Sequence, residues 1–173
     1  MKSIIEGERA LCFWLSQQTE VSLYHSDEKI KQEALDFVSL LTPVVKSLFT
    51  DLAMEITSDA MQIHGGYGFT QDQGIEQLYR DNRITPIYEG TNSVQAADLV
   101  FRKLVNKNGD IINRYLDLIK KESDLEGDAM KPFINDLNYQ INILEKFTTW
   151  IKDKIQNEAE DQNYMRPGGK LPI

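Results

Sequence analysis

A stripe of apolar residues that recurs every three or four positions runs through residues 30 to 63. It constrains the fold more than any other feature of the sequence. Its members are Ile30, Ala34, Phe37, Val38, Leu41, Val44, Leu48, Leu52, Ile56, Ala60 and Ile63. This spacing predicts a long amphipathic helix, with charged residues such as Lys46 and Asp51 on its other faces. Thr42-Pro43 interrupts the stripe and indicates either a kink or a restart of the helix.

We expect one shorter helix before this stripe and another after it. Residues 4–21 predict one before it, and the unbroken apolar block from Ala10 to Leu15 indicates that this helix is buried on more than one side. The segment His64-Gly65-Gly66-Tyr67-Gly68 should end the long helix, with Gly65 as a left-handed cap. A short helix is then expected over residues 74–83.

The second half of the sequence keeps the helical period. A helix carries Val94 to Val105, and Asn92 followed by Gln95 resembles a capping box at its start. Two amphipathic stretches follow, one carrying Ile111 to Ile119 and the other Ile134 to Ile155. The acidic residues between them are predicted to form a loop. With no strand pattern and no internal repeat, the sequence predicts an all-α helical bundle.

Composition excludes several functional classes. Lys and Arg number 19 against 27 Asp and Glu, and a net charge of -8 disfavours binding to nucleic acid. The single cysteine, Cys12, excludes an intramolecular disulfide and suggests a reducing, cytoplasmic compartment; we expect it to be a packed core residue. No apolar run approaches the roughly 20 residues of a membrane span, and Glu6, Glu8 and Arg9 argue against a signal peptide.

No metal site or nucleotide-binding loop is predicted. His25 and His64 lie far apart, without a cysteine or carboxylate at ligand spacing. Gly65-Gly66-x-Gly68 follows a helix rather than a strand, so it does not match a dinucleotide-binding fingerprint.

Three motifs between residues 60 and 95 carry the functional signal. They are Gln62-Ile63-His64-Gly65-Gly66-Tyr67-Gly68-Phe69, then Arg80-Asp81, then Ile87-Tyr88-Glu89-Gly90-Thr91-Asn92. By composition alone they are loops between helices. Their order and spacing resemble the C-terminal helical domain of acyl-CoA dehydrogenases, flavoenzymes of fatty acid metabolism that introduce an α,β double bond into acyl-CoA thioesters. The resemblance covers residues 1–106 and implies a four-helix up-and-down core with extra C-terminal helices.

The resemblance implies a role for most of the motif residues. Glu89 matches the catalytic base, which removes the α-proton of the acyl-CoA substrate while a hydride passes to flavin N5. Tyr88 and Gly90 match residues that line the substrate pocket. The residues that match contacts to the FAD cofactor are Gln62, Gly65, Gly66, Gly68 and Thr91. The first four approach the ADP portion of an FAD held by a neighbouring subunit, which implies a homo-oligomer, either a dimer or a tetramer.

The chemistry of such a base makes opposing demands on Glu89. The α-CH of a thioester is a weak acid, so exclusion of water should strengthen the carboxylate as a base and protect the reduced flavin. A position just before a helix N-terminus instead favours the anion. The same placement would aim backbone N–H groups at the thioester oxygen, and the resemblance implies that the N–H of Glu89 stabilises the developing enolate. For Arg80 and Asp81 we expect an ion pair that braces the loop.

The resemblance also predicts the organisation of the chain. Residues 1–106 correspond to part of the helical domain, 107–156 to a helical C-terminal extension, and 157–173 to a polar tail. The N-terminal helical and central β-domains of the family have no counterpart here, so this fragment alone is expected to be inactive. The extension resembles the subfamily that includes enzymes acting on methylmercaptopropionyl-CoA. Electron-transfer flavoprotein is a candidate partner.

Two other readings stay open at this point. One is an acyl-CoA oxidase-like enzyme, which differs in the access of oxygen to the reduced flavin. The other is a non-catalytic helical interaction module. The sequence leaves undetermined the acyl chain length, the electron acceptor and whether Met1 is a natural start.

Overall fold

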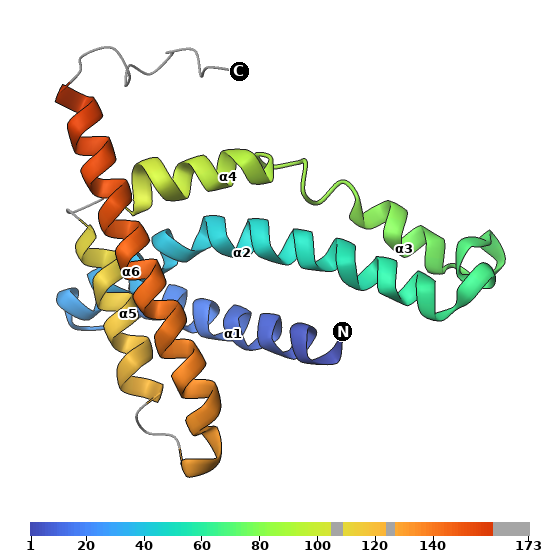
Figure 1. The fold of residues 1–173 in the computed structure, drawn as a ribbon, viewed down its shortest axis with the longest axis horizontal. Coiled ribbons are helices and arrows are strands. Elements are labelled where there is room, and N and C mark those ends of the chain that lie inside the picture. The colour runs from blue at the N-terminus through green and yellow to red at the C-terminus, as the bar shows by residue number, and fades with distance from the viewer. Residues whose placement is uncertain (105–108, 124–126, 161–173) are drawn as a thin grey trace. The chain divides into compact units, whose positions relative to one another are not determined.

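Figure 1 shows the computed structural model of the chain, which describes residues 1–104, 109–123 and 127–160. The regular elements within these ranges are all helical, which confirms the predicted all-α class. The chain divides into two compact units, Met1–Leu99 and Val100–Ile173. Each unit has buried apolar residues of its own, such as Leu40 in the first and Leu116 in the second.

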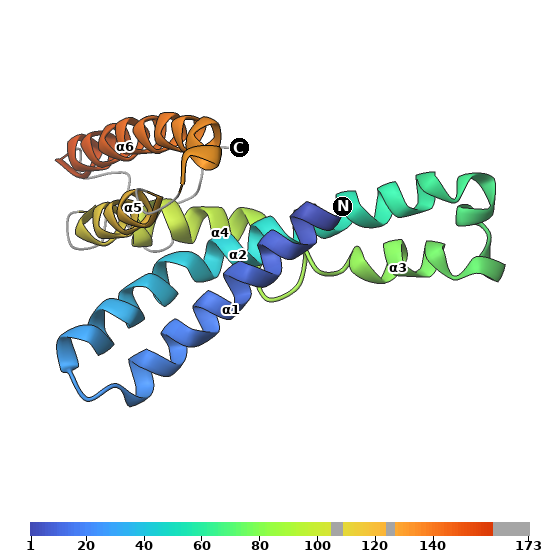
Figure 2. The same ribbon diagram turned by 90° about the horizontal axis from the view of Figure 1, so that it is seen from below.

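The first unit is built on a helical hairpin of α1 (Lys2–Tyr24) and α2 (Glu28–Ile63). The carboxylate of Asp27 caps α2 by accepting from the backbone N–H of Lys29 at 2.8 Å. Trp14 of α1 and Phe37 of α2 bring their rings to a centroid distance of 6.0 Å. Figure 2 shows α1 running along the first half of α2. The predicted stripe therefore packs against α1 over this half.

The predicted burial of α1 is wrong. No residue of α1 is buried, Phe13 is 69% exposed and Cys12 is exposed as well. The block from Ala10 to Leu15 covers more than a full turn, whereas α2 packs against one side of the helix. An apolar sequence shows that surface is available for burial, and it does not show what covers each side.

Helix α2 runs without interruption through Pro43, so the alternative of a helix restart is wrong. Proline removes one helical N–H and crowds the preceding turn. Burial of Pro43 with its neighbours Leu40 and Leu41 favours continuation of the helix at this point. By length and composition α2 is apolar enough to cross a membrane, with an 18-residue window of mean hydropathy 1.4. Core helices of soluble proteins pass the same test, and α2 carries the buried residues of this unit other than Gly68, although only 22% of that window is buried.

The second half of α2 is covered by the elements that follow it. Two short 3₁₀ turns, η1 (Gly65–Phe69) and η2 (Gln71–Gln73), reverse the chain. Helices α3 (Ile75–Asn82) and α4 (Asn92–Asp98) then pack against α2, as Figures 1 and 2 show. The predicted short helix is thus confirmed. A π-helical turn, η3 (Leu99–Lys103), follows α4.

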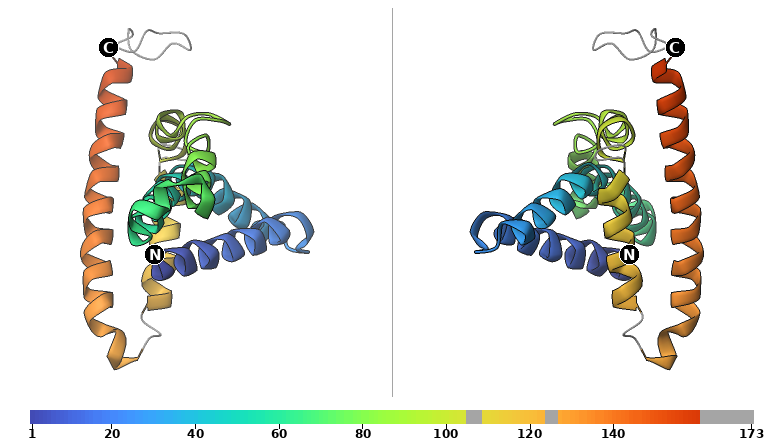
Figure 3. Two further views of the ribbon diagram at one scale, coloured as in Figure 1. Left: turned by 90° about the vertical axis from the view of Figure 1, so that its right-hand side faces the viewer. Right: turned by 90° about the vertical axis from the view of Figure 1, so that its left-hand side faces the viewer.

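The second unit contains α5 (Asp110–Ser123), a 3₁₀ turn η5 (Asp128–Met130) and α6 (Lys131–Glu160). Figure 3 shows α5 and α6 as an antiparallel pair. Both predicted amphipathic stretches are confirmed as helices, with Ile112 and Leu116 of α5 and Ile141 of α6 buried. Lys120 of α5 forms an ion pair with Glu145 of α6.

Two predicted boundaries in this unit shift. Glu122 and Ser123 belong to α5 rather than to the predicted loop of residues 122–128, and residues 124–126 lie outside the described part of the chain. Helix α6 continues to Glu160, so the first four residues of the predicted polar tail are helical. The rest of that tail lies outside the described residues.

Thr148 gives a test of the packing in this second unit. Its side chain is 2% exposed, and its hydroxyl oxygen has no hydrogen-bond partner in the described part of the chain. We expect Thr148→Val to raise the free energy of unfolding by about 1 kcal/mol, because a buried unpaired hydroxyl costs roughly that much. Thermal and urea denaturation followed by circular dichroism measure this.

Thr149→Val is the matched control. Thr149 is exposed, and its hydroxyl donates to the carbonyl of Glu145 at 2.9 Å. Loss of this hydroxyl should change the free energy of unfolding by no more than about 0.5 kcal/mol in either direction. Equal effects of the two variants would contradict the burial of an unpaired hydroxyl at Thr148.

Candidate functional site

The turn before α4 carries Glu89 and is closed by backbone hydrogen bonds. The N–H of Tyr88 donates to the carbonyl of Ile84 at 3.1 Å, and the N–H of Asn92 donates to the carbonyl of Pro86 at 3.2 Å. These bonds fold the segment back on itself over one short loop. Glu89 lies just before a helix N-terminus, as predicted.

The N-cap of α4 is Thr91, and the predicted capping role of Asn92 is wrong. The hydroxyl of Thr91 accepts from the N–H of Val94 at 3.4 Å. Both residue types are good caps, so the sequence pattern alone does not separate two adjacent candidates. A long-range bond decides between them, because the side chain of Asn92 is occupied elsewhere.

Asn92 ties the Glu89 turn to the middle of α2. Its Oδ1 accepts from Lys46 Nζ at 2.8 Å, and its Nδ2 donates to Asp51 Oδ1 at 2.7 Å. The same Nδ2 lies 3.0 Å from Thr50 Oγ1, which donates its own proton to the carbonyl of Lys46, and 3.3 Å from the carbonyl of Ser47. One side chain thus joins residues more than 40 positions apart in the sequence.

The backbone of Glu89 adopts an unusual conformation. Its φ is 54°, and within the described part of the chain no other non-glycine residue has a positive φ. Gly90 follows with a φ of 83°. A non-glycine residue in the left-handed region costs of the order of 1–3 kcal/mol, and such residues cluster at functional sites. Tyr88 and Glu89 are both exposed, and the Glu89 carboxylate makes no hydrogen bond or ion pair to any described residue.

The first motif forms a separate group at the far end of α2. Gly65 has a φ of 61° and ends the helix, as predicted. Nothing lies within 4 Å of a Cβ placed on Gly65 or Gly66. With Gln62 they border a hollow of about 380 Å³ that Ser58, Met61 and Phe69 complete. Open backbone beside a polar side chain fits the close approach of a phosphate-bearing group such as the ADP part of FAD.

Gly68 has a different reason to be glycine. It is buried, and a Cβ at this position would lie 2.4 Å from the carbonyl oxygen of Met61. Close packing of η1 on the end of α2 therefore requires a glycine there with or without a ligand. Its predicted contact with FAD stays a prediction.

The structure keeps the two groups of predicted residues apart. Asn92 fixes the Glu89 turn near Asp51, whereas Gln62 lies eleven residues further along α2. At 1.5 Å per residue this is about 17 Å of helix axis. Thr91 therefore belongs with Tyr88, Glu89 and Gly90, and the four remaining predicted cofactor residues form the other group.

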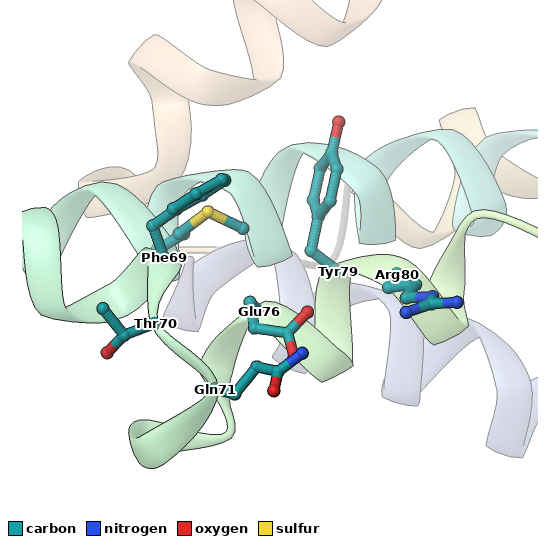
Figure 4. A pocket seen from close by; sticks show the side chains of 7 residues that line it. Phe69, Thr70, Gln71, Glu76, Tyr79 and Arg80 are labelled. Carbon is teal, nitrogen blue, oxygen red and sulfur yellow. The ribbon is translucent and has the colours of Figure 1, made fainter.

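A larger hollow beside the first motif is absent from the sequence prediction. It has a volume of about 520 Å³ and is lined by Met61, Phe69, Thr70, Gln71, Glu76, Tyr79 and Arg80. Figure 4 shows these side chains around the end of α2, η1 and the start of α3. The lining residues come from both sides of a chain reversal, so no local spacing marks them. Only Phe69 and Arg80 belong to a motif.

The predicted ion pair between Arg80 and Asp81 is wrong. Neither residue makes an ion pair with any described residue. Successive residues on a helix point about 100° apart and do not face each other, unlike residues three or four apart. The Arg80 side chain instead borders the hollow, beside Tyr79 in Figure 4.

Comparison with known proteins identifies the family. The profile of "Acyl-CoA dehydrogenase, C-terminal domain" matches residues 17–104, which are 88 of the 173 residues and include all three motifs. The chain belongs to the acyl-CoA dehydrogenase family. Members of this family are flavoproteins that generally use FAD.

Curated relatives support the same assignment. The chain is 40% identical over 119 residues to 3-methylmercaptopropionyl-CoA dehydrogenase of Ruegeria pomeroyi, which covers 69% of this chain and 20% of that protein. It is 32% identical over 115 residues to a butyryl-CoA dehydrogenase of Syntrophomonas wolfei, covering 66% and 19%. A broad-specificity linear acyl-CoA dehydrogenase of Mycobacterium tuberculosis is 36% identical over 112 residues, covering 62% and 18%. The matched part of the chain spans about a fifth of these relatives.

We predict that Asn92→Ala destabilises the first unit by about 1–3 kcal/mol, because it removes the link to α2 and strips partners from Lys46 and Asp51. Chemical denaturation measures the loss. Ser93→Ala is the control, since Ser93 is exposed on the same helix turn and makes no side-chain hydrogen bond in the described structure. If the Asn92 variant is as stable as the Ser93 variant, the turn is not held by this side chain.

The two glycines of the first motif should respond differently to alanine. Gly68→Ala is expected to lower the free energy of unfolding by about 1–3 kcal/mol, because the new methyl group would meet the backbone oxygen of Met61. Gly66→Ala should change it by less than about 0.5 kcal/mol, because its Cβ would enter open space. Melting temperatures of both variants test this, and the reverse order would contradict the packing of η1.

Proposed function

We propose that this chain supplies the C-terminal helical part of an FAD-dependent acyl-CoA dehydrogenase in which Glu89 is the catalytic base. The observation that carries the proposal is the contrast between the backbone of Glu89 and its side chain. The backbone of Glu89 is held in a strained turn, while its carboxylate is exposed and unpaired among the described residues. A side chain that stabilised the fold would have a partner, whereas a base must stay free to meet its substrate.

The α,β-dehydrogenation divides into two transfers of hydrogen. The Glu89 carboxylate takes the α-proton of the thioester, and the electron pair of that C–H bond forms the new double bond. FAD, when bound, would supply the acceptor for the β-hydrogen and its electron pair, so that oxidation of the acyl-CoA is balanced by reduction of the flavin. The chain's own part is to place one carboxylate and to exclude other acids and bases from the α-carbon.

The residues around Glu89 have matching roles in this proposal. Tyr88 and Gly90 line the thioester pocket, and backbone N–H groups at the start of α4 face the oxygen on which negative charge develops. Thr91 accepts a bond from Val94 and keeps its own hydroxyl proton, which it can donate to the flavin. The dipole of α4 stabilises negative charge at the same place.

The separation of the two residue groups supports an oligomeric enzyme. If Glu89 to Thr91 face one FAD, then Gln62, Gly65 and Gly66, about 17 Å further along α2, fit the ADP portion of a second FAD bound by a neighbouring subunit. In this arrangement Gly68 shapes the turn that presents the other two glycines. The proposed assembly is a homo-oligomer whose subunits complete each other's cofactor sites.

The substrate and setting are inferred from the relatives and from the sequence. Two of the relatives are named for the short thioesters 3-methylmercaptopropionyl-CoA and butyryl-CoA, so a short acyl-CoA is the proposed substrate. The single exposed cysteine fits a reducing, cytoplasmic compartment, and electron-transfer flavoprotein is the proposed acceptor. The net charge of -8 gives no support to a nucleic-acid-binding role.

Glu89→Gln tests the proposal in the complete flavin-loaded polypeptide that contains these residues. Short acyl-CoA thioesters are added anaerobically, and bleaching of the oxidised flavin band is followed. We expect the variant to bleach at least about a hundredfold more slowly than the wild type, because an amide is not a base for the α-proton.

Glu55→Gln is the control, since Glu55 is exposed on α2 and makes no hydrogen bond or ion pair to a described residue. It should bleach at the wild-type rate. Rapid bleaching of the Glu89 variant, or no bleaching of the wild type by any thioester, would refute the proposed role.

A further inference from the structure

Gln95 contacts the peptide that joins Glu89 to Gly90. Its Nε2 lies 3.1 Å from the carbonyl oxygen of Glu89. Because a carbonyl oxygen only accepts, the amide of Gln95 must present its NH₂ group there. The same Nε2 would lie 3.1 Å from a Cβ placed on Gly90. The amide therefore lies directly against this peptide, and a side chain at residue 90 would push it away by a few tenths of an ångström.

The position of Gln95 is itself fixed by α4. Its backbone N–H donates to the carbonyl of Thr91 at 3.0 Å, and the Thr91 hydroxyl caps the same turn through Val94. From this helical anchor the Gln95 side chain reaches back six residues to Glu89. The Glu89–Gly90 peptide is thus tied to the first turn of a helix rather than to another loop.

This bond constrains the direction of the Glu89 side chain. The orientation of the Glu89–Gly90 peptide sets ψ of Glu89, and φ and ψ together set where its Cα–Cβ bond points relative to α4. A left-handed non-glycine residue persists only where its surroundings over-determine it. The Glu89 carboxylate contributes no bond within the described structure, so the constraint must come from the backbone and its partners.

We propose that Gln95 is a positioning residue for Glu89: its amide holds the Glu89–Gly90 peptide so that the carboxylate keeps one direction toward the α-carbon of the thioester. The inference rests on the proposed function of Glu89. Gln95 acts through that residue and needs no contact with substrate or cofactor.

Three variants of the complete flavin-loaded protein separate this role from simple packing. Gln95→Met keeps the length of the side chain and removes the donor. Gln95→Glu, when ionised, turns acceptor oxygens toward the Glu89 carbonyl. Gln17→Met makes the same change as the first variant at an exposed position of α1 that has no hydrogen bond to a described residue.

The limiting rate constant of flavin reduction and the dissociation constant of butyryl-CoA are measured separately by anaerobic rapid mixing. We expect Gln95→Met and Gln95→Glu to lower the rate constant about tenfold to a hundredfold, with the dissociation constant changed less than about threefold, because a misplaced base weakens the transition state and not the bound complex. Gln17→Met should match the wild type in both.

Hydrogen exchange gives a readout independent of activity. Backbone amides of residues 87–92 should exchange faster in both Gln95 variants than in the wild type, at unchanged flavin content and melting temperature. A wild-type rate constant in Gln95→Met overturns the inference. Parallel losses of rate, substrate affinity, flavin content and melting temperature also overturn it, because they describe a packing residue.

Glu89→Gln, measured alongside, separates the proposed function of Glu89 from the positioning role of Gln95. If it bleaches normally, the proposed function fails whatever the Gln95 variants do. If it is inactive while Gln95→Met is fully active, the proposed function stands and the positioning role of Gln95 fails.

Discussion

The side chain of Asn92 supplies the contact on which the geometry of the site depends. It places an amide between a lysine ammonium and an aspartate carboxylate of α2, with Thr50 and a backbone carbonyl completing its surroundings. Hydrogen bonds to charged groups are stronger than those between neutral groups. Because this link reaches α2 at its middle, it decides where along the helix the Glu89 turn lies. The bonds of Thr91 and Gln95 then act locally on a turn whose place is already set.

In the Glu89 turn, the backbone holds the conformation and the Glu89 side chain stays unbound. The N–H groups of Tyr88 and Asn92 donate to the carbonyls of Ile84 and Pro86, and the Glu89 carbonyl accepts from Gln95. These bonds offset the conformational cost at Glu89. The carboxylate of Glu89 takes no part in them. In the proposed function, substrate engages this group without first displacing an internal partner.

The sequence was informative where a pattern is periodic or local. The apolar stripe predicted α2, and the glycine after it predicted the left-handed end of the helix. It was uninformative where the deciding partner is distant. Nothing near Asn92 in the sequence indicates that its amide reaches Asp51, and so the pattern places the cap one residue too late.

The predicted burial of the block around Cys12 is wrong for a different reason. Apolar residues do not reveal how many sides of a helix are covered. The predicted Arg80–Asp81 ion pair is wrong because adjacent residues on a helix point in different directions. The family motifs indicated the candidate site residues, whose roles stay proposals, and the hydrogen bond from Gln95 to Glu89 came from the structure.

Helix α2 fixes the spacing of both groups of candidate residues, one at its C-terminal end and the other held through Asn92. This has a consequence for the length of the helix. Between Asp51 and Gln62 the helix makes about three turns. Inserting or deleting a single residue there would rotate the glycine turn by about 100° around the axis relative to the Glu89 turn, while shifting it by only about 1.5 Å. If both groups face flavins of one assembly, the phase of the helix matters far more than its span. Side chains in this segment can vary within the demands of packing, whereas the number of residues must stay fixed.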